Sequence, residues 1–130
     1  MNILIVEDCQ VMQIMIKRAM KISELKPEHI YTACNGREGI KILMREKIDL
    51  VILDMNMPVM DGMEMLEILR SNFETKNVPV LVVSTESNVQ RVEEMMKYGI
   101  EYIHKPFTPE SLISKIGILL NNKFLTGNLN

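Results

Sequence analysis

The sequence predicts an α/β fold in which a five-stranded parallel sheet is covered by helices on both faces. Two observations predict this fold. Short, almost purely apolar segments alternate along the chain with longer segments whose apolar residues recur every three or four positions. Strands that are apolar without alternation are typical of sheets buried on both faces. The alternation of the two kinds of segment occurs five times, which favours a doubly wound sheet.

Five segments are the expected strands. The first, third and fourth are the most apolar, the second is weaker, and the fifth is short and mixed. They cover residues 3–6, 30–33, 50–53, 80–83 and 102–104. For five such strands the expected spatial order is 2-1-3-4-5, the flavodoxin-like winding.

Five helices are expected between and after these strands, because apolar residues follow helical spacing there. The repeating residues are Val11, Ile14, Met15 and Ala19, then Ile40, Leu43 and Met44, then Leu66, Leu69 and Phe73, then Val89, Val92 and Met96, then Leu112, Ile113, Ile116 and Leu120. Capping signals precede four of the helices. They are the pairs Asn35 with Glu38, Asp61 with Glu64, Ser87 with Gln90, and Thr108 before Pro109.

Length and charge limit the kind of protein this is. At 130 residues the chain has the length of one domain, and we expect that domain at 1–121 with a short polar tail at 122–130. The formal net charge is −2, whereas nucleic-acid binding would require a basic surface. We expect no signal peptide, and no apolar run approaches the roughly 18–20 residues of a membrane span. We expect a cytoplasmic protein with no nucleic-acid contact and no membrane insertion.

Polar residues follow the expected strands where those strands end. Glu7 and Asp8 follow the first strand, Asp54 the third, Ser84 the fourth and Lys105 the fifth. Because open α/β sheets bind their ligands at the carboxyl ends of the strands, we expect these side chains at one edge. Taken singly, each could be a helix cap, a turn residue or a surface charge.

Together these residues predict a phosphoryl-transfer site. Clustered carboxylates raise one another's pKa unless a proton or cation joins them. Mg²⁺ suits such a cluster because it takes one or two carboxylates and keeps positions open for phosphate oxygens, and we expect Mn²⁺ to substitute. An aspartate is a known nucleophile in such transfers, so we predict phosphoryl acceptance on Asp54, assisted by Ser84 and Lys105.

With these residues in place, the chain resembles a response-regulator receiver domain, most of all the stand-alone CheY-type chemotaxis regulators. The resemblance covers about residues 2–120 and depends on four motifs in order. They are Ile3-Leu4-Ile5-Val6-Glu7-Asp8, Leu53-Asp54-Met55-Asn56-Met57-Pro58 continuing to Met60-Asp61-Gly62, Val80-Leu81-Val82-Val83-Ser84-Thr85, and His104-Lys105-Pro106-Phe107.

The resemblance implies a metal-binding role for four residues. Asp54 is the implied phosphoacceptor and a metal ligand, and Asp8 is the implied direct ligand beside it. Glu7 stands where many members have Asp, and it is implied to reach the metal through water. Asn56 is implied to bind the metal through its backbone carbonyl.

Further roles concern the phosphoryl group and its signal. Ser84 and Lys105 are implied to contact the phosphoryl group, and Tyr102 is the implied aromatic switch. Asn56 and Glu86 are implied to tune hydrolysis, and we expect a short-lived phosphoryl group. The bond between Lys105 and the following proline is implied to be cis.

The implied function is two-component signal transduction, with chemotaxis as the expected pathway. A histidine kinase or a phosphotransfer protein would donate the phosphoryl group. The phosphorylated chain would bind a downstream target protein through its fourth helix, fifth strand and fifth helix. We expect a monomeric switch rather than an enzyme, one that catalyses only its own phosphorylation and dephosphorylation. A phosphorelay intermediate and a phosphorylation-independent interaction module are the alternatives.

Two other functions of similar folds are disfavoured by particular residues. An aspartyl-phosphate hydrolase carries an acid two residues after its nucleophile, where this chain has Asn56. A flavodoxin needs a hydroxyl- and glycine-rich phosphate loop after the first strand, whereas Glu7 and Asp8 would repel phosphate without a metal. Gly39, where the family often has alanine, and Gly117 leave the packing of two helices open.

Overall fold

The computed structural model describes residues 1–57 and 59–129, and for residues 122–129 it describes the backbone alone. Strands and helices alternate throughout that part of the chain. They are β1 (Asn2–Val6), α1 (Gln10–Ile22), β2 (His29–Ala33), α2 (Gly36–Arg45), β3 (Leu50–Asp54), α3 (Gly62–Ser71), β4 (Val80–Ser84), α4 (Val89–Met96), β5 (Glu101–His104) and α5 (Pro109–Leu129). Pro58 of the second motif and Asn130 of the predicted tail lie outside the described residues.

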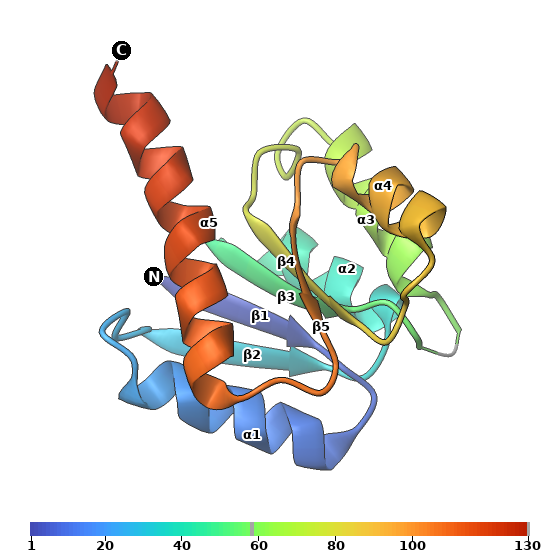
Figure 1. Cartoon of the computed structure of the whole chain (residues 1–130), viewed down its shortest axis with the longest axis horizontal. Coiled ribbons are helices and arrows are strands. Elements are labelled where there is room, and N and C mark those ends of the chain that lie inside the picture. Colours follow the sequence, from blue (N-terminus) through green and yellow to red (C-terminus); the bar gives the residue numbers. More distant parts are fainter. Residues whose placement is uncertain (58, 130) are drawn as a thin grey trace.

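The strands form one parallel sheet in the predicted order, β2-β1-β3-β4-β5 (Figure 1). Val6 pairs with Leu53, and Asp54 pairs with Val83, so the carboxyl ends of the central strands meet at one edge. Each predicted strand is one residue short of the observed one. The additions at β3 and β4 are Asp54 and Ser84 themselves. Asp54 and Ser84 are therefore positioned by the sheet itself and not by a loop.

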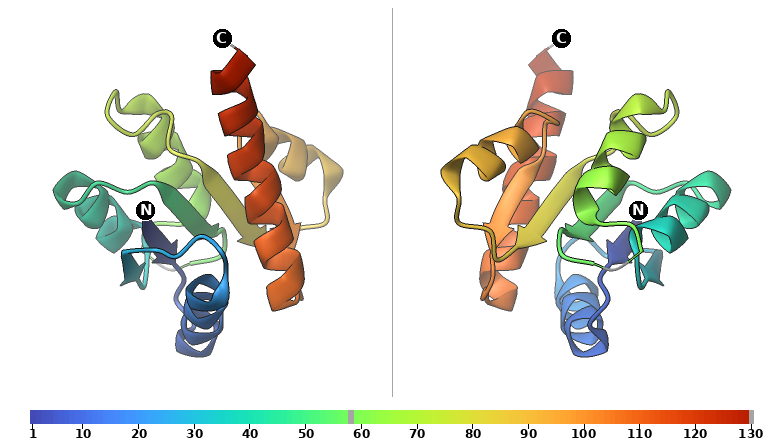
Figure 2. Two further views of the ribbon diagram at one scale, coloured as in Figure 1. Left: turned by 90° about the vertical axis from the view of Figure 1, so that its left-hand side faces the viewer. Right: turned by 90° about the vertical axis from the view of Figure 1, so that its right-hand side faces the viewer.

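Helices cover both faces of the sheet, as predicted (Figure 2). Alternate residues of each strand point to opposite layers. One layer joins Leu4, Val6, Val51, Leu53, Val80 and Val82 to α2, α3 and α4 through Ile42, Leu43, Met65, Leu66, Leu69 and Met95. The other joins Ile3, Ile5, Leu50, Ile52, Leu81 and Val83 to α1 and α5 through Ile16, Ala19, Met20, Leu112, Ile116 and Leu120. Burial on both faces explains why the strand sequences are apolar throughout.

The predicted caps of three helices are confirmed. Asn35, Asp61 and Thr108 each accept a hydrogen bond from the amide three residues later, at 2.9, 2.9 and 3.0 Å. The prediction that α3 reaches Phe73 is wrong, and that side chain is 82% exposed. The helix ends earlier because Asn72 turns the chain, its side chain accepting a hydrogen bond from the amide of residue 74 at 3.0 Å.

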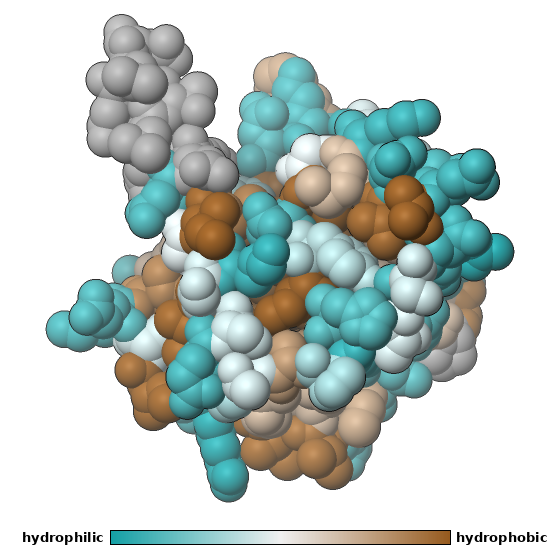
Figure 3. Space-filling view, viewed as in Figure 1, coloured by the Kyte–Doolittle hydropathy of each residue, from teal (hydrophilic) through white to brown (hydrophobic). Residues whose placement is uncertain are grey.

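The buried face of α1 matches the predicted one only in part: Ala19 is buried and Met15 packs against the core as expected. Ile16 and Met20 are buried, whereas Val11 and Ile14 are 76% and 51% exposed. Exposed apolar side chains gather over α1 at the lower edge of the molecule (Figure 3). Because α1 carries apolar residues on more than one side, a three-to-four spacing fits either face, and only packing against the sheet decides between them.

The N-cap of α4 is Asn88, not the predicted Ser87. The Asn88 side chain accepts hydrogen bonds from the amides of residues 90 and 91 at 3.0 and 3.2 Å. The predicted core residues Val89 and Met96 are exposed, and α4 buries Met95 instead. As in α1, packing against the sheet decides which of several apolar residues α4 buries.

Close packing requires two of the glycines. A Cβ on Gly62 would lie 2.8 Å from the Asp54 carbonyl oxygen and 2.6 Å from the next Cα, so the β3–α3 loop can fold tightly over the end of β3. A Cβ on Gly39 would lie 3.1 Å from a methyl group of Val6. A Cβ on Gly117 would meet nothing within 4 Å, so that glycine does not disturb the packing of α5.

The last helix runs as far as Leu129, so the backbone of most of the predicted tail continues α5 (Figure 1). Among the residues that the structure describes, none of the helices has the length and apolar character that a membrane span requires.

Candidate functional site

Three carboxylates gather at the carboxyl edge of the sheet. One oxygen each from Glu7, Asp8 and Asp54 lies within 4.8 Å of the others. Glu7 and Asp54 are 1% and 2% exposed, whereas Asp8 is open to solvent. The three side chains lie close together because β1 and β3 are neighbours in the sheet and end at the same level. The structure thus brings together the three acids that the sequence placed at one edge.

Lys105 completes this cluster from the end of β5. Its Nζ lies 3.3 Å from Glu7 Oε1 and 3.4 Å from Asp54 Oδ1. Burial lowers the pKa of Lys105, but the two carboxylates outweigh burial and hold that pKa above its usual value. The backbone amide of Lys105 donates to the Ser84 carbonyl at 2.8 Å, and the peptide bond to Pro106 is cis, as the resemblance implies.

Glu7 has the perturbed acidity expected of a crowded carboxylate. Burial raises the pKa of Glu7 to about 7, and the hydrogen bond and charge of Asp54 raise it as well. The amide of Cys9, which donates to Glu7 Oε2 at 3.2 Å, and the charge of Lys105 act in the opposite direction. In the absence of a metal, a proton therefore offsets part of the repulsion within the cluster.

The donor atoms suit a hard divalent cation. All three side chains offer oxygen, and the exposed side of Asp8 leaves room for water and phosphate oxygens. The backbone amide of Asn56 donates to Asp54 Oδ1 at 3.2 Å, so the backbone at Asn56 lies against the Asp54 carboxylate. Within the described ranges 1–57 and 59–129, no second group of three acidic, cysteine or histidine side chains comes as close together.

Ser84 and Tyr102 are connected through the backbone of Glu86. Ser84 is buried, and its Oγ accepts a hydrogen bond from the Glu86 amide at 2.9 Å. The Tyr102 hydroxyl donates to the Glu86 carbonyl at 2.5 Å, and the Tyr102 ring packs against the core beneath α4. Burial raises the pKa of Tyr102, which keeps this hydroxyl a donor. The Tyr102 hydroxyl also lies 3.5 Å from the Ser84 carbonyl, so a movement of Ser84 can reach Tyr102 directly or through Glu86.

A pocket of about 320 Å³ opens beside Asp54, between the β3–α3 loop and α4. Asn56, Ser84 and Glu86 line it from the strand ends, and Arg91 lines it from α4. Arg91 Nη1 lies 3.8 Å from Glu86 Oε2, so an ion pair forms part of the wall. The pocket thus lies next to the end of β3, where Asn56 follows Asp54 by two residues.

Sequence reasoning missed two residues of this region, Gln13 and Arg91. The Gln13 side-chain amide donates to the Glu7 carbonyl and fixes the loop that carries the acids. The position of Gln13 near the start of α1, close in sequence to Glu7 and Asp8, was the one feature of the sequence that could have indicated this contact. Nothing in the sequence pairs Arg91 with Glu86 rather than with another acid. His104, which precedes Lys105, contacts the Thr85 carbonyl at 3.1 Å.

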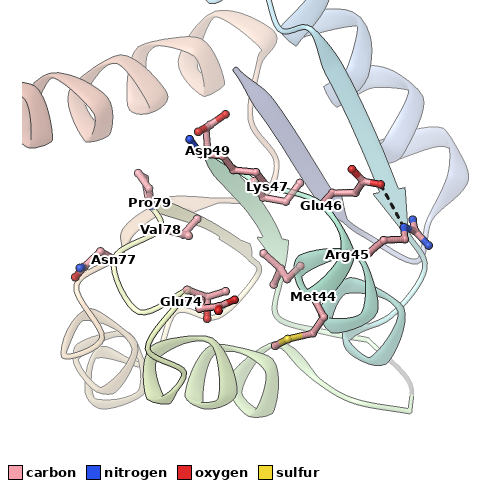
Figure 4. A pocket seen from close by; sticks show the side chains of 12 residues that line it. Met44, Arg45, Glu46, Lys47, Asp49, Glu74, Asn77, Val78 and Pro79 are labelled. Atoms are coloured by element: carbon pink, nitrogen blue, oxygen red, sulfur yellow. Dashed lines mark ion pairs between the residues drawn. The ribbon is translucent and has the colours of Figure 1, made fainter.

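A separate pocket of about 500 Å³ lies at the opposite edge of the sheet, between the end of α2 and the α3–β4 loop (Figure 4). Its lining carries both signs of charge, and Arg45 pairs there with Glu46 at 3.4 Å. Because its charges offset one another and no three metal-binding groups converge there among the described residues, it offers no comparable chemistry.

Known proteins resemble this chain in both sequence and fold. The sequence model of the response regulator receiver domain matches residues 3–117. Chemotaxis protein CheY1 of Helicobacter pylori is 33% identical over 122 residues, which is 92% of this chain and 97% of that protein. Chemotaxis protein CheY-3 of Vibrio cholerae is 32% identical over 117 residues, 89% of this chain and 88% of that protein. The solved structure of Vibrio cholerae CheY4 has a TM-score of 0.82 at 28% identity, covering 91% of this chain and 97% of that one.

The raised pKa of Glu7 predicts that stability without metal falls as pH rises. Between pH 4.5, the ordinary pKa of Glu7, and about pH 7, the folded chain keeps a proton on Glu7 that the unfolded chain has lost. The stability that this proton contributes is therefore fully present below pH 4.5 and is lost as the pH rises to about 7. Since one pKa unit corresponds to about 1.4 kcal/mol, a rise from 4.5 to about 7 corresponds to a loss on the order of 3 kcal/mol. Denaturant unfolding in chelator at a series of pH values measures it. In Glu7→Gln this decline is expected to disappear, and parallel declines in both proteins would contradict the prediction.

Proposed function

The chain belongs to the response regulator receiver domain family, and on that premise we propose that it is a phosphorylation switch whose phosphoacceptor is Asp54. The observation that carries the proposal is the cluster of three carboxylates within 4.8 Å, with Lys105 3.4 Å from Asp54. Such a cluster can hold a divalent cation, and with that cation Lys105 can neutralise and position a phosphoryl group. The cluster contains no general base with an orienting partner, which suits acceptance rather than substrate turnover.

Asp54 acts as the nucleophile in this proposal. One of its oxygens attacks the phosphorus of a phosphohistidine, the phosphorus–nitrogen bond breaks, and the electron pair leaves with the imidazole nitrogen, which takes up a proton. Lys105 supplies positive charge to one phosphoryl oxygen, a role supported by its present place between Glu7 and Asp54. The Ser84 hydroxyl, which now accepts a hydrogen bond from the Glu86 amide, turns to donate to another phosphoryl oxygen.

We propose Mg²⁺ as the cofactor, with Mn²⁺ as a substitute. Asp8, Asp54 and the Asn56 carbonyl would hold the ion directly, and Glu7 would reach it through water. Bound there, the ion would supply charge neutralisation at the phosphoryl oxygens. The all-oxygen donor set and the exposed side of Asp8 support this assignment.

We propose a histidine kinase or phosphotransfer protein as the donor and a separate downstream protein as the target. The relatives named chemotaxis proteins favour a chemotaxis pathway over a phosphorelay. The presence of every expected site residue disfavours a phosphorylation-independent module. In this proposal residues 1–121 form a monomeric receiver with the tail at 122–130, and the chain catalyses only its own phosphorylation and dephosphorylation. Asn56 and Glu86 tune hydrolysis, which their place on the wall of the pocket beside Asp54 supports.

The signal leaves through α4, β5 and α5. Phosphorylation adds charge and acceptor oxygens next to Ser84, and a hydroxyl that turns toward them changes its contact with the Glu86 amide. Tyr102 responds because its hydroxyl is bound to the carbonyl of the same residue. A target that prefers one position of the ring shifts the population by its differential affinity.

The phosphoacceptor is tested by replacing Asp54. Treated with acetyl phosphate and Mg²⁺, the wild-type chain is expected to gain one phosphoryl group by intact-mass measurement, and Asp54→Asn to gain none, because the amide is not a nucleophile. An undiminished adduct on Asp54→Asn would contradict the assignment.

Two neighbouring variants control this experiment. Asp8→Ala removes a proposed metal ligand and is expected to lose most of the Mg²⁺-dependent adduct. Cys9→Ser changes the next residue, whose contact with Glu7 is through its backbone amide, and is expected to behave as wild type.

The switch is tested by Tyr102→Ala. Phosphorylation by acetyl phosphate is expected to keep its wild-type rate within about twofold, since the ring does not touch Asp54. The gain in affinity for a target protein on phosphorylation is expected to vanish, measured by titration of phosphorylated and unphosphorylated chain. Tyr31→Ala on the far edge strand β2 is the matched control. A gain that survives in Tyr102→Ala would assign the switch to another residue.

A further inference from the structure

Helix α4 is the most weakly embedded of the helices that cover the sheet. It buries one residue, Met95, while Val89 and Met96 are 69% and 45% exposed. A short helix with so little buried surface is positioned mainly by what holds its two ends.

The first turn of α4 is attached to the candidate site through Glu86. The Glu86 carboxylate accepts a hydrogen bond from the Asn88 amide at 3.1 Å and lies 3.8 Å from the Arg91 guanidinium. The backbone of Glu86 is in turn bound to Ser84 Oγ and to the Tyr102 hydroxyl. Whatever moves Ser84 therefore acts on this end of the helix.

The turn that closes α4 at its C-terminal end, residues 97–99, is held from a different element, by Arg70 of α3. Arg70 Nε donates to the Tyr98 carbonyl at 2.7 Å, and Nη2 donates to the Gly99 carbonyl at 3.3 Å. Gly99, in the turn that follows α4, has a φ of +70°, a conformation that suits glycine. Arg70 Nη1 donates to the carbonyls of Val78 and Lys76 in the α3–β4 loop, at 2.7 and 3.1 Å.

Arg70 binds only backbone carbonyls within the described part of the chain. Burial lowers the pKa of its guanidinium, yet no ion pair to a carboxylate within 4 Å is found for it there. Hydrogen bonds from a charged donor are stronger than neutral ones, and the carbonyls at a helix C-terminus attract positive charge. None of the segments it joins carries a residue of the candidate site.

We propose that Arg70 is a positioning residue that serves as the pivot of α4. When Asp54 is phosphorylated, the first turn of α4 moves with Ser84 and Glu86, while the last turn stays fixed to α3 by Arg70. The response of α4 is then a swing about its C-terminal end rather than a shift of the whole helix. The inference depends on the proposed function for the stimulus, but the attachment itself can be tested without it.

The attachment is tested by hydrogen exchange of the unphosphorylated chain. The amides of Lys97, Tyr98 and Gly99 close the last turn of α4 by donating to carbonyls four or three residues before them. In Arg70→Ala they are expected to exchange about tenfold faster, after correction for exchange of the core strands β1 and β3. The Val92 amide, bound to the Asn88 carbonyl at the first turn, is expected to change less than about twofold.

Two variants separate an attachment from a general stabilising role. Arg45→Ala removes an exposed arginine at the end of α2 and is expected to leave α4 unchanged. Arg70→Lys keeps a charge but cannot reach four carbonyls, so an intermediate rate is expected. If Arg70→Ala accelerates exchange of the core strands and of both ends of α4 to the same extent, the proposal is overturned.

The pivot is tested with Mg²⁺ and beryllofluoride, which mimics a phosphoryl group on a carboxylate. In the wild-type chain, exchange is expected to change at residues 86–93 and not at 97–100. In Arg70→Ala the change is expected to extend through residue 100. If fluorine NMR shows the ligand bound and the wild-type change covers the whole helix or is absent from it, the pivot is wrong. If the ligand does not bind at all, the proposed function fails first.

Discussion

Mutual repulsion among Glu7, Asp8 and Asp54 is the constraint on which the rest of the site depends. Their oxygens lie within 4.8 Å of one another, and two of the three side chains are almost completely buried. The chain offsets this repulsion with Lys105, which follows β5, and with a proton on Glu7, whose pKa burial and Asp54 raise to about 7. A divalent cation would also reduce the repulsion among the carboxylates, and a phosphoryl group on Asp54 would change which groups Lys105 contacts. Metal binding and signalling therefore both depend on the excess negative charge that the fold places at this edge.

The sheet order turns that local imbalance into a signal. β1 and β3 bring the acids together, and β4 and β5 add Ser84 and Lys105 at the same edge. From Ser84, hydrogen bonds lead through Glu86 to Tyr102 and to the first turn of α4, which has little buried surface of its own. Helix α4, which buries the least surface against the core, is thus the element that responds most readily.

The sequence was sufficient for the sheet and for the acidic edge, because both depend on patterns that packing enforces. Strands buried on both faces must be apolar, and Asp54 could be placed because it directly follows such a strand. The outward turn of Val11 and the choice of Asn88 over Ser87 as a cap could not be predicted, since both alternatives satisfy the same local chemistry. Arg70 left no signal at all, because its partners are backbone carbonyls, including those of Tyr98 and Gly99, about 28 and 29 residues away.

A structure of the chain with Mg²⁺ and beryllofluoride tests the central claim most directly. The account predicts beryllium on an Asp54 oxygen and Mg²⁺ bound by Asp8, Asp54 and the Asn56 carbonyl. It also predicts Lys105 Nζ within about 3 Å of a fluorine. Mg²⁺ bound away from the three carboxylates, or Lys105 still bridging Glu7 and Asp54 with no contact to the ligand, would contradict it.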